Sequence, residues 1–303
     1  MVYFAGAAGG DAASAASSPV REVPVIREDH YTMNARVRPL LLFWISRDDV
    51  GGARITWRSG ADGRHGFEML VGSDPARAPR KINRWGFIAE DVSGGTTDVL
   101  SFMKDSGEQT LKEADATTAV ESTDRVPFSA VRTVISGSKA TSGLLAFRAP
   151  PAITLNQLDD LLALVPAAAQ TTRVIDLPPG TEHGFLLAVA GIIQRSASPC
   201  RAGDKGLIKA IQPVPYLYYQ TLYDLSLTSC EYHRELHAKK TTFADVVEAD
   251  FQIRNRVSHE VTKFQVDYGT ADPIRNVPVR MVFRPRWWME VELVLDVEGK
   301  HRP

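Results

Sequence analysis

Apolar and polar residues alternate along four successive segments in the last third of the chain. These segments are residues 247–254, 262–268, 277–284 and 290–298. In each, one parity is mostly Val, Leu, Ile, Met, Phe or Tyr, and the other is mostly charged or polar. A period of two predicts a strand with one buried face. Four such strands, the first two joined by a turn around Ser258, predict an antiparallel sheet with one wet face.

A similar pattern near the start predicts a second meander. Residues 40–46 are apolar on both faces, as in a central strand, whereas residues 53–58 and 67–71 alternate. The intervening stretches, residues 48–52 and 59–66, are rich in Asp and Gly and read as turns. We therefore expect three short antiparallel strands here.

The middle of the chain carries the helix signals. In residues 154–165, Thr154 and Gln157 form a capping-box pattern ahead of a leucine stripe, and a proline follows. Residues 83–91 are compatible with a short helix. The apolar run at 185–193 fits either a helix or a buried strand, because periodicity alone does not separate the two.

Together these elements predict an α+β, mainly β fold. We expect antiparallel meanders at both ends, arranged as a sandwich or an open barrel, with one or two central helices. The boundaries predict an N-terminal β-rich half at 23–150, a helical connecting segment at 151–212 and a C-terminal sheet at 213–303. The two β-rich parts could form one domain or two.

Composition narrows the class of protein. The 303 residues are 44% hydrophobic, which is enough for a substantial core, and the net charge of −1 gives no bulk attraction to nucleic acid. No apolar run reaches the roughly 20 residues that span a bilayer. Residues 1–22 are rich in Ala, Gly and Ser and read as a flexible segment, typical of the start of an exported chain. We expect a periplasmic or extracellular protein, with a cytoplasmic one as the alternative.

The chain has two cysteines, Cys200 and Cys230. In an exported protein an even, sparse count suggests one disulfide, here closing a loop of about thirty residues. Two unconnected thiols remain the alternative, because the spacing does not determine their distance.

The sequence CEYHRELH, at residues 230–237, is the densest cluster of potential ligands. As a helix it would bring Cys230, His233 and His237 to one face, where they could bind a soft metal. As a strand it would place His233, Glu235 and His237 on one face and Cys230 on the other. The aromatic, β-prone sequence before it favours the strand, whose histidines would face solvent, so we predict no metal site. The three polar residues remain candidates for acid–base chemistry.

Two arginine–tryptophan segments are candidate binding surfaces. Guanidinium groups bind carboxylates and phosphates, and exposed tryptophans stack on sugars or protein side chains. The residues concerned are Arg77, Arg80, Arg84, Trp85, Arg284, Arg286, Trp287 and Trp288.

The sequence contains no nucleophile elbow, phosphate-binding loop or dinucleotide-binding motif, so we expect no cofactor. The first functional hypothesis is an exported protein that binds a protein, carbohydrate or anionic ligand as an accessory or structural component of the cell envelope. The alternative is a hydrolase or lyase of an envelope or extracellular polymer, possibly metal-assisted in that case. The oligomeric state stays open.

Overall fold

The computed structural model describes residues 23–37, 45–78, 83–103, 125–150, 157–167, 169, 171–286 and 289–297. These residues form fourteen strands and three helices. The strands are β1 (Val25–Val37), β2 (Ile45–Ser59), β3 (His65–Ser73), β4 (Trp85–Ser93), β5 (Thr96–Met103), β6 (Val126–Ser136), β7 (Lys139–Ala149), β8 (Thr171–Asp176), β9 (Val214–Tyr218), β10 (Thr221–Ala238), β11 (Thr241–Asn255), β12 (Val261–Gly269), β13 (Pro278–Arg286) and β14 (Met289–Leu295). The helices are α1 (Leu158–Leu162), α2 (Phe185–Ala202) and α3 (Lys205–Ala210).

All fourteen strands belong to one sheet, in the order β8-β7-β6-β5-β4-β3-β2-β1-β14-β13-β12-β11-β10-β9. Neighbouring strands are antiparallel, and the mainly β prediction is confirmed. Most pairs are sequential hairpins, but β1 pairs with β14 from Tyr31 opposite Leu295 to Val37 opposite Met289. This one pairing joins the strands of the N-terminal half to those of the C-terminal half.

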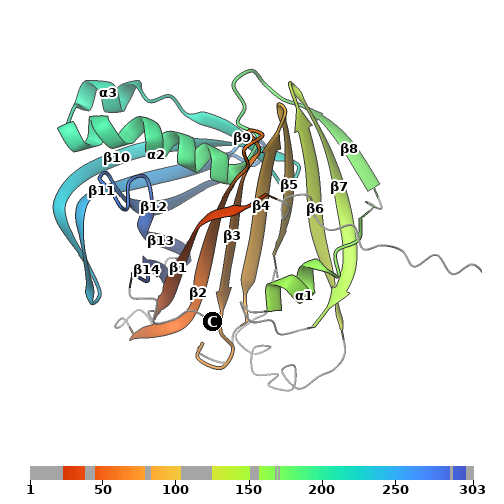
Figure 1. Cartoon of the computed structure of the whole chain (residues 1–303), viewed down its shortest axis with the longest axis horizontal. Helices are drawn as coiled ribbons and strands as arrows, with labels where there is room; N and C mark the ends of the chain where they lie inside the picture. The colour runs from red at the N-terminus through yellow and green to blue at the C-terminus, as the bar shows by residue number, and fades with distance from the viewer. Residues whose placement is uncertain are drawn as a thin grey trace, which may run out of the picture.

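The C-terminal strands curve away from β2–β8, with α2 and α3 on their side (Figure 1). The curvature brings β9, at one end of the sheet, against the face of β4–β7. Leu217 of β9 packs in one apolar cluster with Ile88, Val99 and Ile135 of β4, β5 and β6. The other face of the same strands packs on α1 through Leu161. Strands β4 and β5 are therefore largely buried on both faces.

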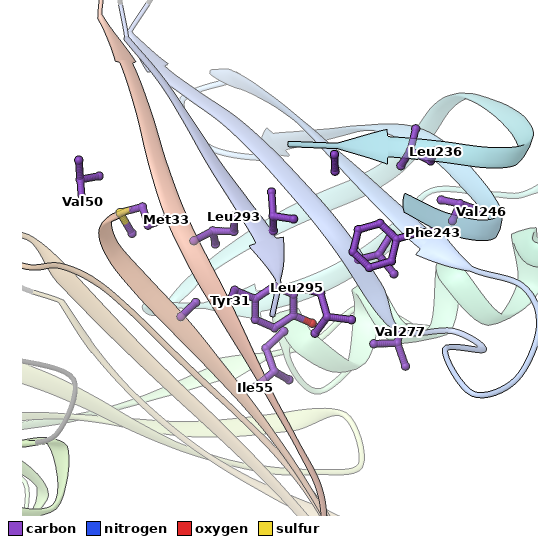
Figure 2. Packing of buried hydrophobic residues seen from close by; sticks show 14 of the residues in the cluster. Tyr31, Met33, Val50, Ile55, Leu236, Phe243, Val246, Val277, Leu293 and Leu295 are labelled. Atoms are coloured by element: carbon purple, nitrogen blue, oxygen red, sulfur yellow. The ribbon is translucent and has the colours of Figure 1, made fainter. Parts of the chain in front are cut away.

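The central core lies where β1 and β14 meet the curved C-terminal strands. Figure 2 shows Tyr31 and Leu295 near Phe243. The Tyr31 hydroxyl donates a hydrogen bond of 2.9 Å to the carbonyl of Pro278. Burial of its aromatic ring thus comes with a satisfied polar group.

The apolar run at residues 185–193 forms the first half of helix α2. Its buried positions, which include Ala188, Ile192 and Ser196, recur at helical spacing and face β9–β12. Gly203 follows the helix with a φ of 65°, the left-handed conformation that glycine adopts at low cost. None of the described helices has the length and apolar character needed to cross a membrane.

Cys200 of α2 and Cys230 of β10 form a disulfide, with their Cα atoms 5.9 Å apart. The pairing proposed from the sequence is therefore present. The bond fixes the C-terminal end of α2 to a long strand of the sheet.

Three local expectations are wrong, each for a physical reason. Most of the predicted helix at residues 83–91 lies in β4, which begins at Trp85, since burial on both faces removes the alternation that identifies a strand. Residues 48–52 lie inside β2 rather than in a turn: Asp49 has a φ of 58°, and the register with β1 shifts nearby. Gly51 allows β2 to approach β3 closely, because a Cβ atom on it would lie 2.2 Å from the carbonyl oxygen of Gly72. Strand β1 was not expected at all.

Two further expectations are confirmed, and two others concern residues outside the described part of the chain. The 247–254 and 262–268 segments pair as a hairpin, with Phe251 opposite Phe264. Helix α1 lies within the predicted 154–165 helix. Residues 1–22 lie outside the described residues, as do residues 40–44 of the first predicted strand.

Replacing both cysteines by serine should lower the free energy of unfolding by roughly 3 to 4 kcal/mol, because the unfolded chain loses a cross-link that closes a loop of about thirty residues. Urea denaturation of the oxidised wild type and the double variant measures the difference. Reductant should lower the stability of the wild type and leave that of the variant unchanged. Equal midpoints for both proteins under oxidising conditions would show that the disulfide contributes nothing.

Candidate functional site

The β1–β2 and β13–β14 hairpins lie side by side at one end of the sheet. We call this end of the sheet the rim. Val37, at the end of β1, pairs with Ile45 of β2 and with Met289 of β14. Met289 in turn pairs with Arg286 of β13. The loop between β3 and β4 lies at the same end, so the rim gathers segments far apart in sequence.

Ion pairs connect β1, β14 and β13 along the rim. Glu290 accepts a bond of 3.2 Å from Nη1 of Arg36 on one oxygen, and Arg284 approaches its other oxygen to 2.8 Å. Burial alone would raise the pKa of Glu290, but the two guanidinium groups outweigh it and lower the pKa. Glu290 is thus a buried anion held by two partly exposed arginines.

A second set of ion pairs connects the neighbouring loops to β2. Arg77, from the loop between β3 and β4, pairs with Asp49 and, at 3.0 Å, with Asp74. Lys239, in the turn between β10 and β11, lies 2.7 Å from Asp48. The rim therefore carries both signs of charge on several chain segments.

The structure brings some of the predicted binding residues together and separates others. Arg77 and Arg284 both lie on the rim, 52% and 67% exposed in their side chains. Arg84 is exposed next to β4. Trp85, by contrast, is only 6% exposed and packs against Phe102 and Phe128, so its indole belongs to the core and not to a surface.

The remaining predicted residues of these segments are not described in full. Arg80, Trp287 and Trp288 lie outside the described residues, and Arg286 is described by its backbone pairing alone.

The CEYHRELH segment is part of strand β10, as its context indicated. His237 lies 2.9 Å from the hydroxyl of Thr242, and Glu235 is exposed. His233 lies 3.9 Å from Glu248 of β11. Among the described residues no group of three or more His, Cys, Asp or Glu side chains is placed to hold a metal ion.

A polar network that sequence reasoning missed crosses β12, β13 and β14. Arg280 donates to Glu292 at 2.6 Å and to Asp267 at 3.1 Å, and Gln265 donates to Asp267 at 2.8 Å. Asp267 is fully buried, and burial raises its pKa to about 6 against the opposing effects of Gln265 and Arg280. The alternation placed these residues on one face, and opposite charges on neighbouring strands were the available signal.

Replacing Arg280 by Gln should destabilise the protein by about 3 to 5 kcal/mol at pH 8, because it leaves buried carboxylates without their cation. The loss should be smaller at pH 5, where Asp267 is protonated. The pKa of Asp267 is higher in the folded protein than in the unfolded chain, so the contribution of Asp267 to stability falls as the pH rises. Removing Arg280 raises this pKa further and makes the fall larger. Chemical denaturation at both pH values measures it, with exposed Arg254→Gln as the control; an equal loss at the two pH values would contradict the assignment.

Comparisons with known proteins add little to this geometry. No protein-family model matches the chain, and no curated protein matches it. Among solved structures, the chain is similar to a beta-barrel-like protein of the domain of unknown function DUF1849 from Brucella abortus. The two share 9% identity, over 90% of this chain and 96% of that one, with a TM-score of 0.38. A similarity of this size carries no argument about the function of the chain.

Proposed function

We propose that the protein is an exported accessory component of the cell envelope that binds a partner through the rim. The observation that carries the proposal is that Arg77 and Arg284 both lie at the same end of the sheet. These residues come from the two segments that the sequence marked as binding surfaces, and they lie 207 positions apart along the chain (284 − 77).

A short series of residues on β14, β1 and β2 connects Arg284 with Arg77. Arg284 holds Glu290, which also holds Arg36 of β1. Two positions before Arg36, Asn34 accepts a bond of 3.2 Å from the backbone N–H of Asp49, the ion-pair partner of Arg77. Carboxylates hold Arg77 and Arg284 in place while more than half of each side chain stays exposed, and fixed side chains lose less entropy on binding.

The charge pattern favours a particular kind of partner. A surface with arginines, aspartates and a lysine in alternation is complementary to another surface of mixed charge. Arginine is also among the residues enriched at protein interfaces. We therefore favour a protein partner over a carbohydrate or a simple anion.

The disulfide supports the proposed compartment. Disulfides persist in the periplasm and outside the cell and are rare in the reducing cytosol. The Cys200–Cys230 bond is compatible with export, and the location in the envelope is part of the proposal.

Site-specific photo-crosslinking in intact cells tests the proposal. A benzophenone amino acid at Arg84 or Arg284, on the rim, should give a discrete protein adduct that is recovered in the envelope fraction. The same probe at exposed Lys139 provides the matched control, because the turn between β6 and β7 lies at the opposite end of the sheet. Absence of adducts from both rim positions, or the same adducts from Lys139, would count against the rim as the binding surface.

A further inference from the structure

The junction where the two ends of the sheet meet, which we call the seam, has apolar packing but little backbone pairing. On one side lie Ile88, Val99 and Ile135 of β4–β6, and on the other Leu217 of β9 and Leu186 of α2. In the part of the chain that the structure describes, β9 pairs with β10 and, by a single bridge, with Glu182, but with none of β3–β8. Closure of the seam therefore depends on side chains.

Glu90 of β4 provides the main polar contact across the seam. It is fully buried, and its two carboxylate oxygens accept bonds of 2.8 Å from the backbone N–H groups of Leu186 and Leu187. These are orphan donors of the first turn of α2, which has no side-chain cap of its own. The cap thus comes from a strand 96 residues away in sequence from Leu186.

The helix start is shaped for this carboxylate. A Cβ atom at Gly184 would lie 2.2 Å from the carboxyl carbon of Glu90, so any larger residue there would displace the contact. Next to it, Nδ1 of His183 lies 3.2 Å from the hydroxyl of Thr97 on β5. The start of α2 is therefore attached to β4 and β5 by a small set of polar contacts.

The other end of α2 is attached to the opposite side of the seam. The Cys200–Cys230 disulfide holds it on β10, and the buried face of α2 packs on β9–β12. Helix α2 consequently belongs to the C-terminal part of the sheet at one end and contacts β4 through its first turn.

We propose that Glu90 is the latch of a pH-sensitive seam: when Glu90 ionises, the cost of a charge buried in the seam favours separation of the first turn of α2 and the β9–β10 hairpin from β4–β7. The disulfide keeps the C-terminal end of α2 in place, so opening is local and exposes the apolar residues of the seam. This inference is independent of the rim and of the partner proposed above.

The groups that face Glu90 determine the direction of the response. They are the carboxylate of Glu182 and the phenols of Tyr216 and Tyr218, whereas the imidazole of His183 is bonded to Thr97. Burial raises the pKa of Glu90 to about 7; the backbone N–H groups oppose this, and Glu182 adds to it. The closed state binds the extra proton, so it is favoured at acid pH and loses stability as the pH rises from the ordinary value of 4.5 through 7.

Hydrogen–deuterium exchange of the full-length, oxidised protein tests the proposal. After correction for the intrinsic exchange rate, opening at residues 185–190 should increase roughly tenfold between pH 6 and pH 8.5, as linkage predicts for a group whose pKa falls from about 7 to about 4.5 on opening. Residues 197–202, at the disulfide-bonded end of α2, should show no comparable increase. This comparison uses the wild type alone and does not depend on the folding of any variant.

Two variants complete the test. Glu90→Gln keeps the shape without the titration and should abolish the pH dependence at residues 185–190. Asp267→Asn removes another buried carboxylate, on the opposite face of β12 from the Val266 and Tyr268 that pack on α2, and should retain the wild-type response. The proposal is overturned if wild-type opening does not change with pH, if both ends of α2 respond alike, or if Glu90→Gln retains the wild-type response.

Discussion

The pairing of β1 with β14 is the interaction on which the rest of the structure depends. Every other strand pair connects sequence neighbours, so without this ladder the chain would form two separate meanders. The ladder places Met33 opposite Leu293 and Tyr31 opposite Leu295, at the centre of the core of Figure 2. The polar positions of the same strands, Arg36 and Glu290, then meet at the rim. Core and candidate site follow from one register.

The curvature of the sheet creates a second requirement, because the C-terminal strands must be covered on their inner side. Helix α2 does this with a buried face that packs on Val247, Phe251 and Val266, among others. A disulfide at one end and the carboxylate of Glu90 at the other hold the helix in position. The covalent contact is permanent under oxidising conditions, whereas the carboxylate contact responds to pH. The two ends of one helix therefore differ in how readily they can move.

Much of the fold could be predicted where burial is one-sided. Strands β11 and β12 bury one face, so Phe251 and Phe264 stand out against charged neighbours and the hairpin was evident. Strand β4 could not be recognised, since Trp85 and Phe87 face α1 while Ile88 and Glu90 face the seam. Gly51 resembles a turn glycine, and only its distance to the carbonyl of Gly72 reveals a close approach between strands.

The candidate site, too, could be predicted only in part. Residue type alone identified Arg77 and Arg284 as possible binding residues, but their proximity depends on the β1–β14 ladder, a long-range contact that one sequence does not reveal. Trp85 was predicted to bind a ligand and is instead a core residue. Glu90 gave no signal, because its partners are backbone N–H groups of a helix 96 residues later. Almost any residue can supply a backbone N–H group, so the sequence does not indicate a contact of this kind.

Disulfide trapping across β1 and β14 tests the central claim most directly. Residues directly opposite on antiparallel strands have Cβ atoms about 4.5 to 5.5 Å apart, close enough for a cross-link. The pair Arg36→Cys/Glu290→Cys is in register, and Arg36→Cys/Val291→Cys is displaced by one residue, with the second side chain on the other face. Peptide mapping after mild oxidation should find the cross-link in the first protein and not in the second. Absence of the bond from the first, or equal cross-linking in both, would contradict the pairing that unites the two halves and forms the rim.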